Sequence, residues 1–463
     1  MSVGAIHIRK KQDVDMTQGN IIGHIIRFSI PLLIGNLFQQ LYNTVDTWVV
    51  GNYVSNEAFS AVGSVAPIVN MLIGAFTGLA SGSGVVISQY YGAGRKDKVQ
   101  ESVHTAIGMT MILAVVFTAV GLLFAPYAVG FTNLHESAVN DANTYLTIYF
   151  GGMVGLMFYN MGAAILRAVG DSQRPFYYLM VCAVLNTILD LVFVLVLHMG
   201  VEGVALATIL SQAVSAVLVI IALLRTNSCI KLAIPKIKIE WSILKKMLFV
   251  GVPAGLQLGI TAFSNIFVQS YINHFDQGST SANYMAGWTA YLKIDQLLFL
   301  PMQSIALAVT TFVGQNLGKK QAHRARQGVT SAVIIAMSAT AVLMIPVLIF
   351  APKIVGFLNN KPEVIANGTL FIRWLTPFYI ICCFNQIYAS ALRGAGNSRA
   401  CMFIMLGSFV LFRQIYLFCM AQICNEIIPI AMAYPAGWIV CSIITYAYYR
   451  KVSLEKNRLV EDN

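Results

Sequence analysis

The chain has 463 residues, of which 57% are hydrophobic and only 11% are charged, and its formal net charge is +11. A soluble domain typically carries about 25% charged residues, so this composition excludes a soluble multidomain protein, and it equally excludes a disordered chain. The composition therefore predicts a polytopic membrane protein.

Apolar segments long enough to cross a bilayer recur along the whole chain. A spanning helix needs about 20 mainly apolar residues, and short polar or Gly/Pro-containing turns separate the segments. We predict an all-α integral membrane protein with about twelve transmembrane helices. The expected spans are 24–50, 57–88, 100–126, 138–166, 175–198, 201–225, 242–274, 283–314, 326–351, 364–392, 400–424 and 427–450.

Basic residues lie mainly in every second loop between these spans. Examples are the GRKDK loop at 94–98, the GKK loop at 318–320 and the tail from Arg450. This alternation is typical of membrane topology and not of a nucleic-acid-binding surface. We therefore expect a multi-pass protein of the cytoplasmic membrane with both termini in the cytoplasm. Polar residues follow the basic triplet 9–11, so no cleavable signal peptide is expected.

Two short motifs occur twice at the same offset. LRAVGDS at 166–172 recurs as LRGAGNS at 392–398, and QYYG at 89–92 recurs as QNLG at 315–318. Two matches at one offset indicate a duplication. Each half contains an even number of spans, so the halves should be parallel repeats related by an axis along the membrane normal, as in many transporters.

The duplication predicts the domain organisation. An N-terminal six-helix lobe (1–225) and a C-terminal six-helix lobe (242–450) should be joined by a cytoplasmic linker (226–241) and followed by a cytoplasmic tail (451–463). The Ile/Lys alternation of the linker suits a segment on an anionic membrane surface, and a solvated linker remains the alternative.

Acidic residues inside the first six spans point to an ion site. An acid at the centre of a spanning helix costs about 2.5–3.5 kcal/mol, so Asp46 and Asp190 should face a cavity or a partner. Asn186 lies one helical turn before Asp190 and shares its face. Counting 1.5 Å per residue places these three residues and Thr208 at a similar depth, in the outer half of the N-terminal lobe.

Carboxylate, amide and hydroxyl oxygens can hold a monovalent cation, and two carboxyls can share a proton. We therefore predict a cation-coupling site, with H⁺ or Na⁺ as the ion and Na⁺ possible at Asp46, Asn186, Asp190 and Thr208. A structural hydrogen bond between helices is the alternative. At the repeat offset, Phe412 is the equivalent of Asn186 and Tyr416 is the equivalent of Asp190. The second lobe therefore should not contain a copy of this site.

Other polar and aromatic residues are weaker candidates. Lys293 and Asp295 are two residues apart on different helix faces, and a structural or gating ion pair is favoured for each over a substrate contact. Arg413 could pair with an acid or extend to the membrane surface. A substrate cavity suited to aromatic cations could be lined by Gln39, Tyr42, Asn43, Tyr159, Met302 and Asp295, although aromatic side chains in helices more often simply pack.

Cysteine and histidine usage predicts no metal cofactor. None of the eight cysteines forms a C-x-x-C pair, and no Cys/His spacing suits zinc. We expect no cofactor other than the coupling ion.

Over nearly its whole length the chain resembles the multidrug and toxic compound extrusion (MATE) transporters. The resemblance rests on FSIPLLIGNLFQQLYNTVDTWVVG, on VISQYYGAGR with TTFVGQNLGKK, and on LRAVGDSQRP with LRGAGNS. It implies a monomer with twelve helices in two lobes that exports cationic or amphipathic organic compounds in exchange for Na⁺ or protons.

The resemblance also implies roles for particular residues. The family's coupling acid of the first helix matches Asp46, and the cation cluster of related members matches Asn186, Asp190 and Thr208, with Asn160 as a looser match. One branch also uses acids in the seventh and tenth helices, which GVPAGLQLGITAFSN and LTPFYIICCFNQIYAS lack. That departure is typical of the DinF-like branch.

Two other functions were weighed. A flippase for lipid-linked saccharides would share this architecture, but it should place cationic residues in the cavity to bind phosphate. A membrane enzyme would need a catalytic constellation or a sizeable loop domain, and the longest loop is a short basic linker. A transporter of small organic molecules, without nucleic-acid partners, is therefore expected.

Overall fold

The computed structural model describes residues 14–130, 136–277, 283–424 and 426–460. In these ranges 12 helices are long and apolar enough to cross a membrane, which confirms the predicted all-α fold class. The basic triplet at 9–11 lies outside the described residues.

The first half of the chain contains six long helices, α1 (Ile21–Tyr53), α2 (Asn56–Gly92), α3 (Lys96–Gly130), α4 (Glu136–Ala168), α5 (Gln173–Leu191) and α6 (Val201–Arg225), with a π-helical turn η1 (Val192–Val196) after α5. The linker that follows contains a 3₁₀ turn, η2 (Ile234–Lys236).

The second half has more, and shorter, pieces. They are α7 (Trp241–Gln277), α8 (Tyr284–Gly318), α9 (Ala322–Ile349), α10 (Ala351–Leu358), α11 (Pro362–Leu375), the 3₁₀ turn η3 (Thr376–Phe378), α12 (Tyr379–Gly394), α13 (Ser398–Leu406), the π-helical turn η4 (Gly407–Phe412), α14 (Arg413–Ile423), α15 (Ile427–Ala431), α16 (Ala433–Lys451) and the 3₁₀ turn η5 (Glu455–Asn457).

Several helices are longer than their apolar segments predicted. The span expected at 100–126 is the helix Lys96–Gly130, which has 35 residues, and a helix of that length measures about 50 Å against a hydrocarbon core of about 30 Å. The helix is therefore longer than the hydrocarbon core needs, and its first turn, which starts at Lys96 and Asp97, is polar. The span expected at 364–392 is instead two helices joined at η3, where Pro377 lacks the N–H that would continue an α-helix.

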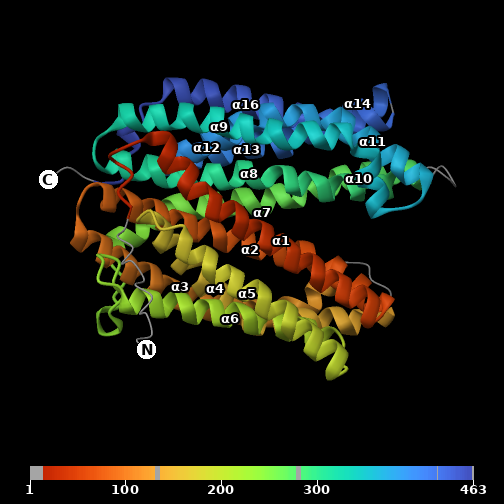
Figure 1. Cartoon of the computed structure of the whole chain (residues 1–463), viewed down its shortest axis with the longest axis horizontal. Helices are drawn as coiled ribbons and strands as arrows, with labels where there is room; N and C mark the ends of the chain where they lie inside the picture. Colours follow the sequence, from red (N-terminus) through yellow and green to blue (C-terminus); the bar gives the residue numbers. More distant parts are fainter. Residues whose placement is uncertain (1–13, 131–135, 278–282, 425, 461–463) are drawn as a thin grey trace, which may run out of the picture.

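The helices form two bundles that lie side by side (Figure 1). α1 to α6 make one bundle and α7 to α16 the other, and the chain starts and stops at the same end of the molecule, which we call the terminal end. Between the bundles, α2 packs along α7 and α8, and α1 packs along α8. Buried apolar residues form one large core cluster in each half, with the second-half cluster extending onto α1.

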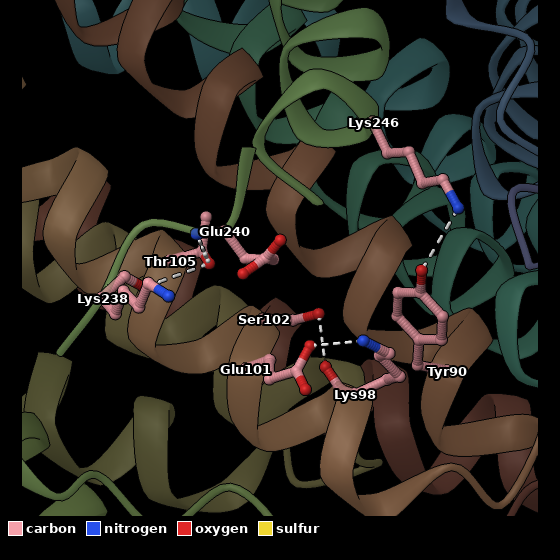
Figure 2. Close-up of polar contacts among 8 residues, drawn as sticks. All are labelled: Tyr90, Lys98, Glu101, Ser102, Thr105, Lys238, Glu240 and Lys246. Carbon is pink, nitrogen blue, oxygen red and sulfur yellow. Dashed lines mark hydrogen bonds and ion pairs between the residues drawn. The ribbon is translucent and has the colours of Figure 1, made fainter. Parts of the chain in front are cut away.

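The linker between the halves packs on α3 (Figure 2). The Thr105 hydroxyl accepts a hydrogen bond from the Glu240 N–H at 3.1 Å and donates to the Lys238 carbonyl at 3.5 Å. Ile237 and Ile239 pack against the core of the first half. The linker is therefore packed on the first half through its backbone and through Ile237 and Ile239, whereas Ile234 is 63% exposed.

Candidate functional site

Four of the predicted polar residues meet between α1, α5 and α6. Asp46 of α1 lies beside Asp190 of α5 and beside Thr208 of α6. Asn186 lies one turn before Asp190 on the same helix. These contacts exist because α5 packs against both α1 and α6, so three helices each contribute to one polar cluster.

Most polar atoms of this cluster are buried without a hydrogen-bond partner. Asn186 and Asp190 are 0% exposed. Among the described residues, nothing bonds either carboxylate oxygen of Asp190, Oδ1 of Asp46 or either side-chain atom of Asn186. The Thr208 hydroxyl donates to the Val204 carbonyl at 3.0 Å, which leaves its lone pairs available.

Such a cluster is costly, so it requires a physical reason. A buried donor or acceptor left unsatisfied costs about 1–3 kcal/mol, and native proteins contain few of them. Two neighbouring carboxylates also repel each other. A proton shared between them, or a monovalent cation bound by their oxygens with those of Asn186 and Thr208, would relieve both problems.

Three tyrosines surround the acid pair, and sequence reasoning assigned only one of them. Tyr145 and Tyr149 of α4 stack with ring centroids 6.1 Å apart and lie near Asp46. Tyr42 of α1, which the sequence analysis placed in the substrate cavity, is buried next to the same acid. The spacing of four residues between Tyr145 and Tyr149 was a usable signal, because it puts both on one helix face.

A cavity of about 100 Å³ lies between α1, α4, α5 and α6, on the terminal-end side of the acid pair. Its polar lining consists of Asn36, Gln39, Tyr159, Asn160, Arg167 and Gln212. Of these, the sequence predicted Gln39 and Tyr159 for the substrate cavity and Asn160 for the cation cluster.

The cavity is linked to the acid pair by one polar contact. Gln212 on the cavity wall donates from Nε2 to the Tyr42 hydroxyl at 3.5 Å, and Tyr42 neighbours Asp46. A ligand that touches Gln212 would therefore be connected to Asp46 through two side chains, those of Gln212 and Tyr42. The structure places Asn160 on the cavity wall, where its amide donates to the Leu156 carbonyl at 2.8 Å.

Arg167 is a cavity residue that sequence reasoning missed. Its side chain lines the cavity and neighbours Tyr159. The two ion pairs found among the described residues, Lys98–Glu101 and Arg174–Asp171, do not include it. The repeated LRAVGDS motif contained the signal, because Arg167 is its only cation.

The other predicted cavity residues do not line this cavity. Met302 is 0% exposed and packs in the core cluster of the second half, so it has no surface for a ligand in this conformation. Asn43 is exposed on α1, rotated about 100° around the helix from Tyr42. Asp295 lies on α8 in the second half.

The expected ion pair at Asp295 is not formed. Its carboxylate accepts hydrogen bonds from the Tyr379 hydroxyl and, at 3.4 Å, from the Tyr291 hydroxyl. Lys293 is exposed, because a two-residue spacing puts it on another face of the helix. Two tyrosine hydroxyls therefore satisfy the Asp295 carboxylate, for which the sequence predicted a cationic partner.

Arg413 is buried, and among the residues that the structure describes it forms no ion pair with an acid. It is 3% exposed and donates to the Ser264 hydroxyl and to Oδ1 of Asn265, both at 2.9 Å. Its guanidinium carbon lies 5.0 Å from the centroid of the Tyr434 ring, a cation–π contact. This arginine therefore joins α14 to α7.

Twelve candidate spans around a buried cluster of acidic and polar side chains and a polar cavity are the features of a multi-pass membrane transporter. The family model named MatE matches residues 31–192 and again residues 253–417. The chain therefore belongs to the MATE family of multidrug efflux transporters, which are not enzymes. The double match agrees with the internal repeat.

Similar proteins cover almost the whole chain. The "Probable multidrug resistance protein YoeA" of Bacillus subtilis is 27% identical over 454 residues, 94% of this chain and 95% of that protein. The "Probable multidrug resistance protein YpnP" of the same organism is 25% identical over 399 residues, 86% of this chain and 88% of that protein. A solved MOP superfamily transporter from Pyrococcus furiosus shares the fold, with a TM-score of 0.89 at 23% identity over 96% of this chain and 98% of that one.

Proposed function

We propose that this protein is an antiporter that exports cationic or amphipathic organic compounds in exchange for protons or Na⁺. Two lobes, residues 1–225 and 242–450, would alternate access to a site between them. The relatives YoeA and YpnP are named as probable multidrug resistance proteins, which supports drug-like substrates. The observation that carries the proposal is the buried, unsatisfied acid pair beside a polar cavity.

In this proposal the coupling ion binds at Asp46 and Asp190, with Asn186 and Thr208 as further oxygen donors. The middle of α7, residues 251–265, contains no acid where Gln257 and Thr261 stand, which supports membership of the DinF-like branch and coupling through the first half alone. The basic loops at the terminal end support an orientation with both termini in the cytoplasm. The transporter would act as a monomer.

The test is gradient-driven efflux from proteoliposomes with Asp46→Asn. Asparagine keeps the shape but cannot release a proton and binds a cation more weakly, so efflux driven by a pH or Na⁺ gradient should fall at least about tenfold. Asp97→Asn, at an exposed acid in the first turn of α3, is the matched control and should transport normally. The pH and Na⁺ gradients, imposed separately, identify the ion.

Efflux that persists in Asp46→Asn would show that this acid does not couple the ion. Transport by the wild-type protein without any ion gradient would remove the antiport proposal altogether.

One observation favours the second candidate, a flippase for lipid-linked saccharides. Such a substrate carries phosphate, and Arg167 places a cation on the cavity wall without an ion pair among the described residues. Arginine binds phosphate through paired hydrogen bonds.

The two functions predict opposite results for Arg167→Gln. A phosphate-bearing substrate should lose about tenfold or more in apparent affinity, because a charge-assisted contact disappears, whereas export of a cationic dye should be unchanged or improved. Inhibition of dye efflux by an added lipid diphosphate, compared between wild type and variant, gives the measurement. Equal inhibition in both proteins contradicts a phosphate site at Arg167.

A further inference from the structure

Two glutamines from the duplicated motifs cross between the halves at the terminal end. Gln89 of α2 donates from Nε2 to the Gly394 carbonyl of α12 at 2.9 Å, and Gln315 of α8 donates from Nε2 to the Ala168 carbonyl of α4 at 2.9 Å. Both glutamines are 0% exposed. Gly394 and Ala168 are equivalent at the repeat offset, as are the two glutamines. The same contact is therefore made twice, once from the first half to the second and once from the second half to the first.

The second polar atom of each glutamine holds one end of the chain. Oε1 of Gln315 accepts a hydrogen bond from the Met16 N–H at 3.0 Å. Oε1 of Gln89 accepts one from the Leu459 N–H at 2.8 Å. Both the nitrogen and the oxygen of each amide group are therefore hydrogen-bonded, with one bond to the opposite half and one to a terminal segment.

The terminal segments themselves cross between the halves. Met16 is 1% exposed and belongs to the core cluster of the second half, and its carbonyl accepts hydrogen bonds from Asn316 at 3.4 Å and Arg324 at 3.2 Å. Val460 is 5% exposed and belongs to the core cluster of the first half. Each end of the chain thus buries an apolar side chain in the half to which it is not directly joined.

Glycines let the two helix ends touch at this place. A Cβ atom at Gly92 of α2 would collide with the backbone oxygen of Gln315, and one at Gly318 of α8 would collide with the backbone oxygen of Gln89. These two glycines are again equivalent at the repeat offset. The backbones of α2 and α8 are therefore in direct contact where the glutamines cross.

We propose that Gln89 and Gln315, together with the segments around Met16 and Leu459, form a two-part clasp that holds the halves closed at the terminal end. Both parts must release before this end can open. The proposal rests on the proposed alternation of access between two states. It states that these residues and the two terminal segments stabilise the state that is closed at the terminal end.

Hydrogen–deuterium exchange of the full-length protein in lipid nanodiscs tests the clasp. Gln89→Ala and Gln315→Ala each remove two buried hydrogen bonds, so amide exchange in 14–19, in 456–460 and at the meeting ends of α2 and α8 should rise about tenfold. Because the two parts act together, each variant should loosen both terminal segments. Gln100→Ala is the matched control, since the Gln100 side chain donates to the Lys231 carbonyl of the linker and belongs to neither of the two contacts between the halves.

The cooperative response is what distinguishes a clasp from two local contacts. If Gln89→Ala loosens only 456–460 and leaves 14–19 at the wild-type rate, the proposal is overturned. Leu459→Pro serves as a second variant in case the alanine variants fold poorly, because it removes the N–H that donates to Oε1 of Gln89 while leaving both glutamines in place. It also removes the leucine side chain, which packs on the core of the first half, and it should loosen 14–19 as well. The exchange measurement needs no substrate, so a wild-type protein that fails to show antiport would refute the proposed function and still leave the clasp tested.

Discussion

Asp190 shows what a single residue contributes to this transporter and what it costs. Its carboxyl group is fully buried, and neither oxygen has a hydrogen-bond donor among the described residues. A buried polar group without partners lowers stability, so selection for stability alone would remove it. Its presence therefore indicates a functional role, because functional sites commonly sacrifice stability. Without a bound proton or cation, the unsatisfied carboxyl group is expected to lower the stability of the folded protein.

Replacing Asp190 with leucine should therefore stabilise the protein while ending ion coupling. Leucine has the same number and branching of side-chain heavy atoms as aspartate, is somewhat larger and has no polar atom, so the free energy of unfolding should increase by about 1–3 kcal/mol. The measurement is the midpoint of thermal unfolding in detergent, followed by tryptophan fluorescence. Asp97→Leu, at an exposed position, should change the midpoint little. A lower midpoint for Asp190→Leu would mean that its carboxyl group stabilises the fold.

At the scale of elements, the contact between α2 and α7 depends on glycines. A Cβ at Gly78 would collide with the backbone of Gly255, and one at Gly82 with the backbone of Gly251. Small residues at helix crossings allow the close backbone approach on which packing in membranes depends. This crossing joins the two halves, so it sets their separation along the middle of the molecule.

Gly78→Ala should weaken this crossing. The added methyl group forces α2 and α7 apart, and overpacking of this kind costs about 1–3 kcal/mol. The measurement is again the thermal midpoint, and Gly63→Ala is the matched control, because no atom lies within 4 Å of a Cβ at that position of the same helix. Equal midpoints for the two variants would show that the helices can separate without loss.

How far the sequence predicts these elements depends on the kind of signal. Apolar length and the loop charges predicted the spans, and spacing along α5 predicted that Asn186 and Asp190 share a face. Two π-helical turns, one that begins two residues after Asp190 and one directly before Arg413, left no trace in the apolar pattern. A π turn inserts one residue into a continuing helix, and no residue type specifies it.

For the whole molecule, the duplicated motifs predicted two parallel halves but not how they meet. A fixed offset shows that two segments are equivalent, yet it says nothing about which surfaces face each other. The hydrogen bonds of Gln89 and Gln315 join residues that are 147 to 370 apart in the chain. Tyr379, which is 84 residues from Asp295, was missed for the same reason. Tyr291 lies one helical turn before Asp295, so its contact could have been predicted from the spacing.

The reciprocal glutamine contact has the geometry of an isologous dimer interface. In a two-fold dimer, residue i of one subunit contacts residue j of the other, and j contacts i; here Gln89 meets Gly394 while Gln315 meets Ala168, the equivalent pair. A six-helix ancestor could have dimerised through this same surface before its gene was fused with its copy. Fusion then freed each copy to change alone, which explains how one half came to hold Asp190 where the other has Tyr416 while the surface between them stayed symmetric.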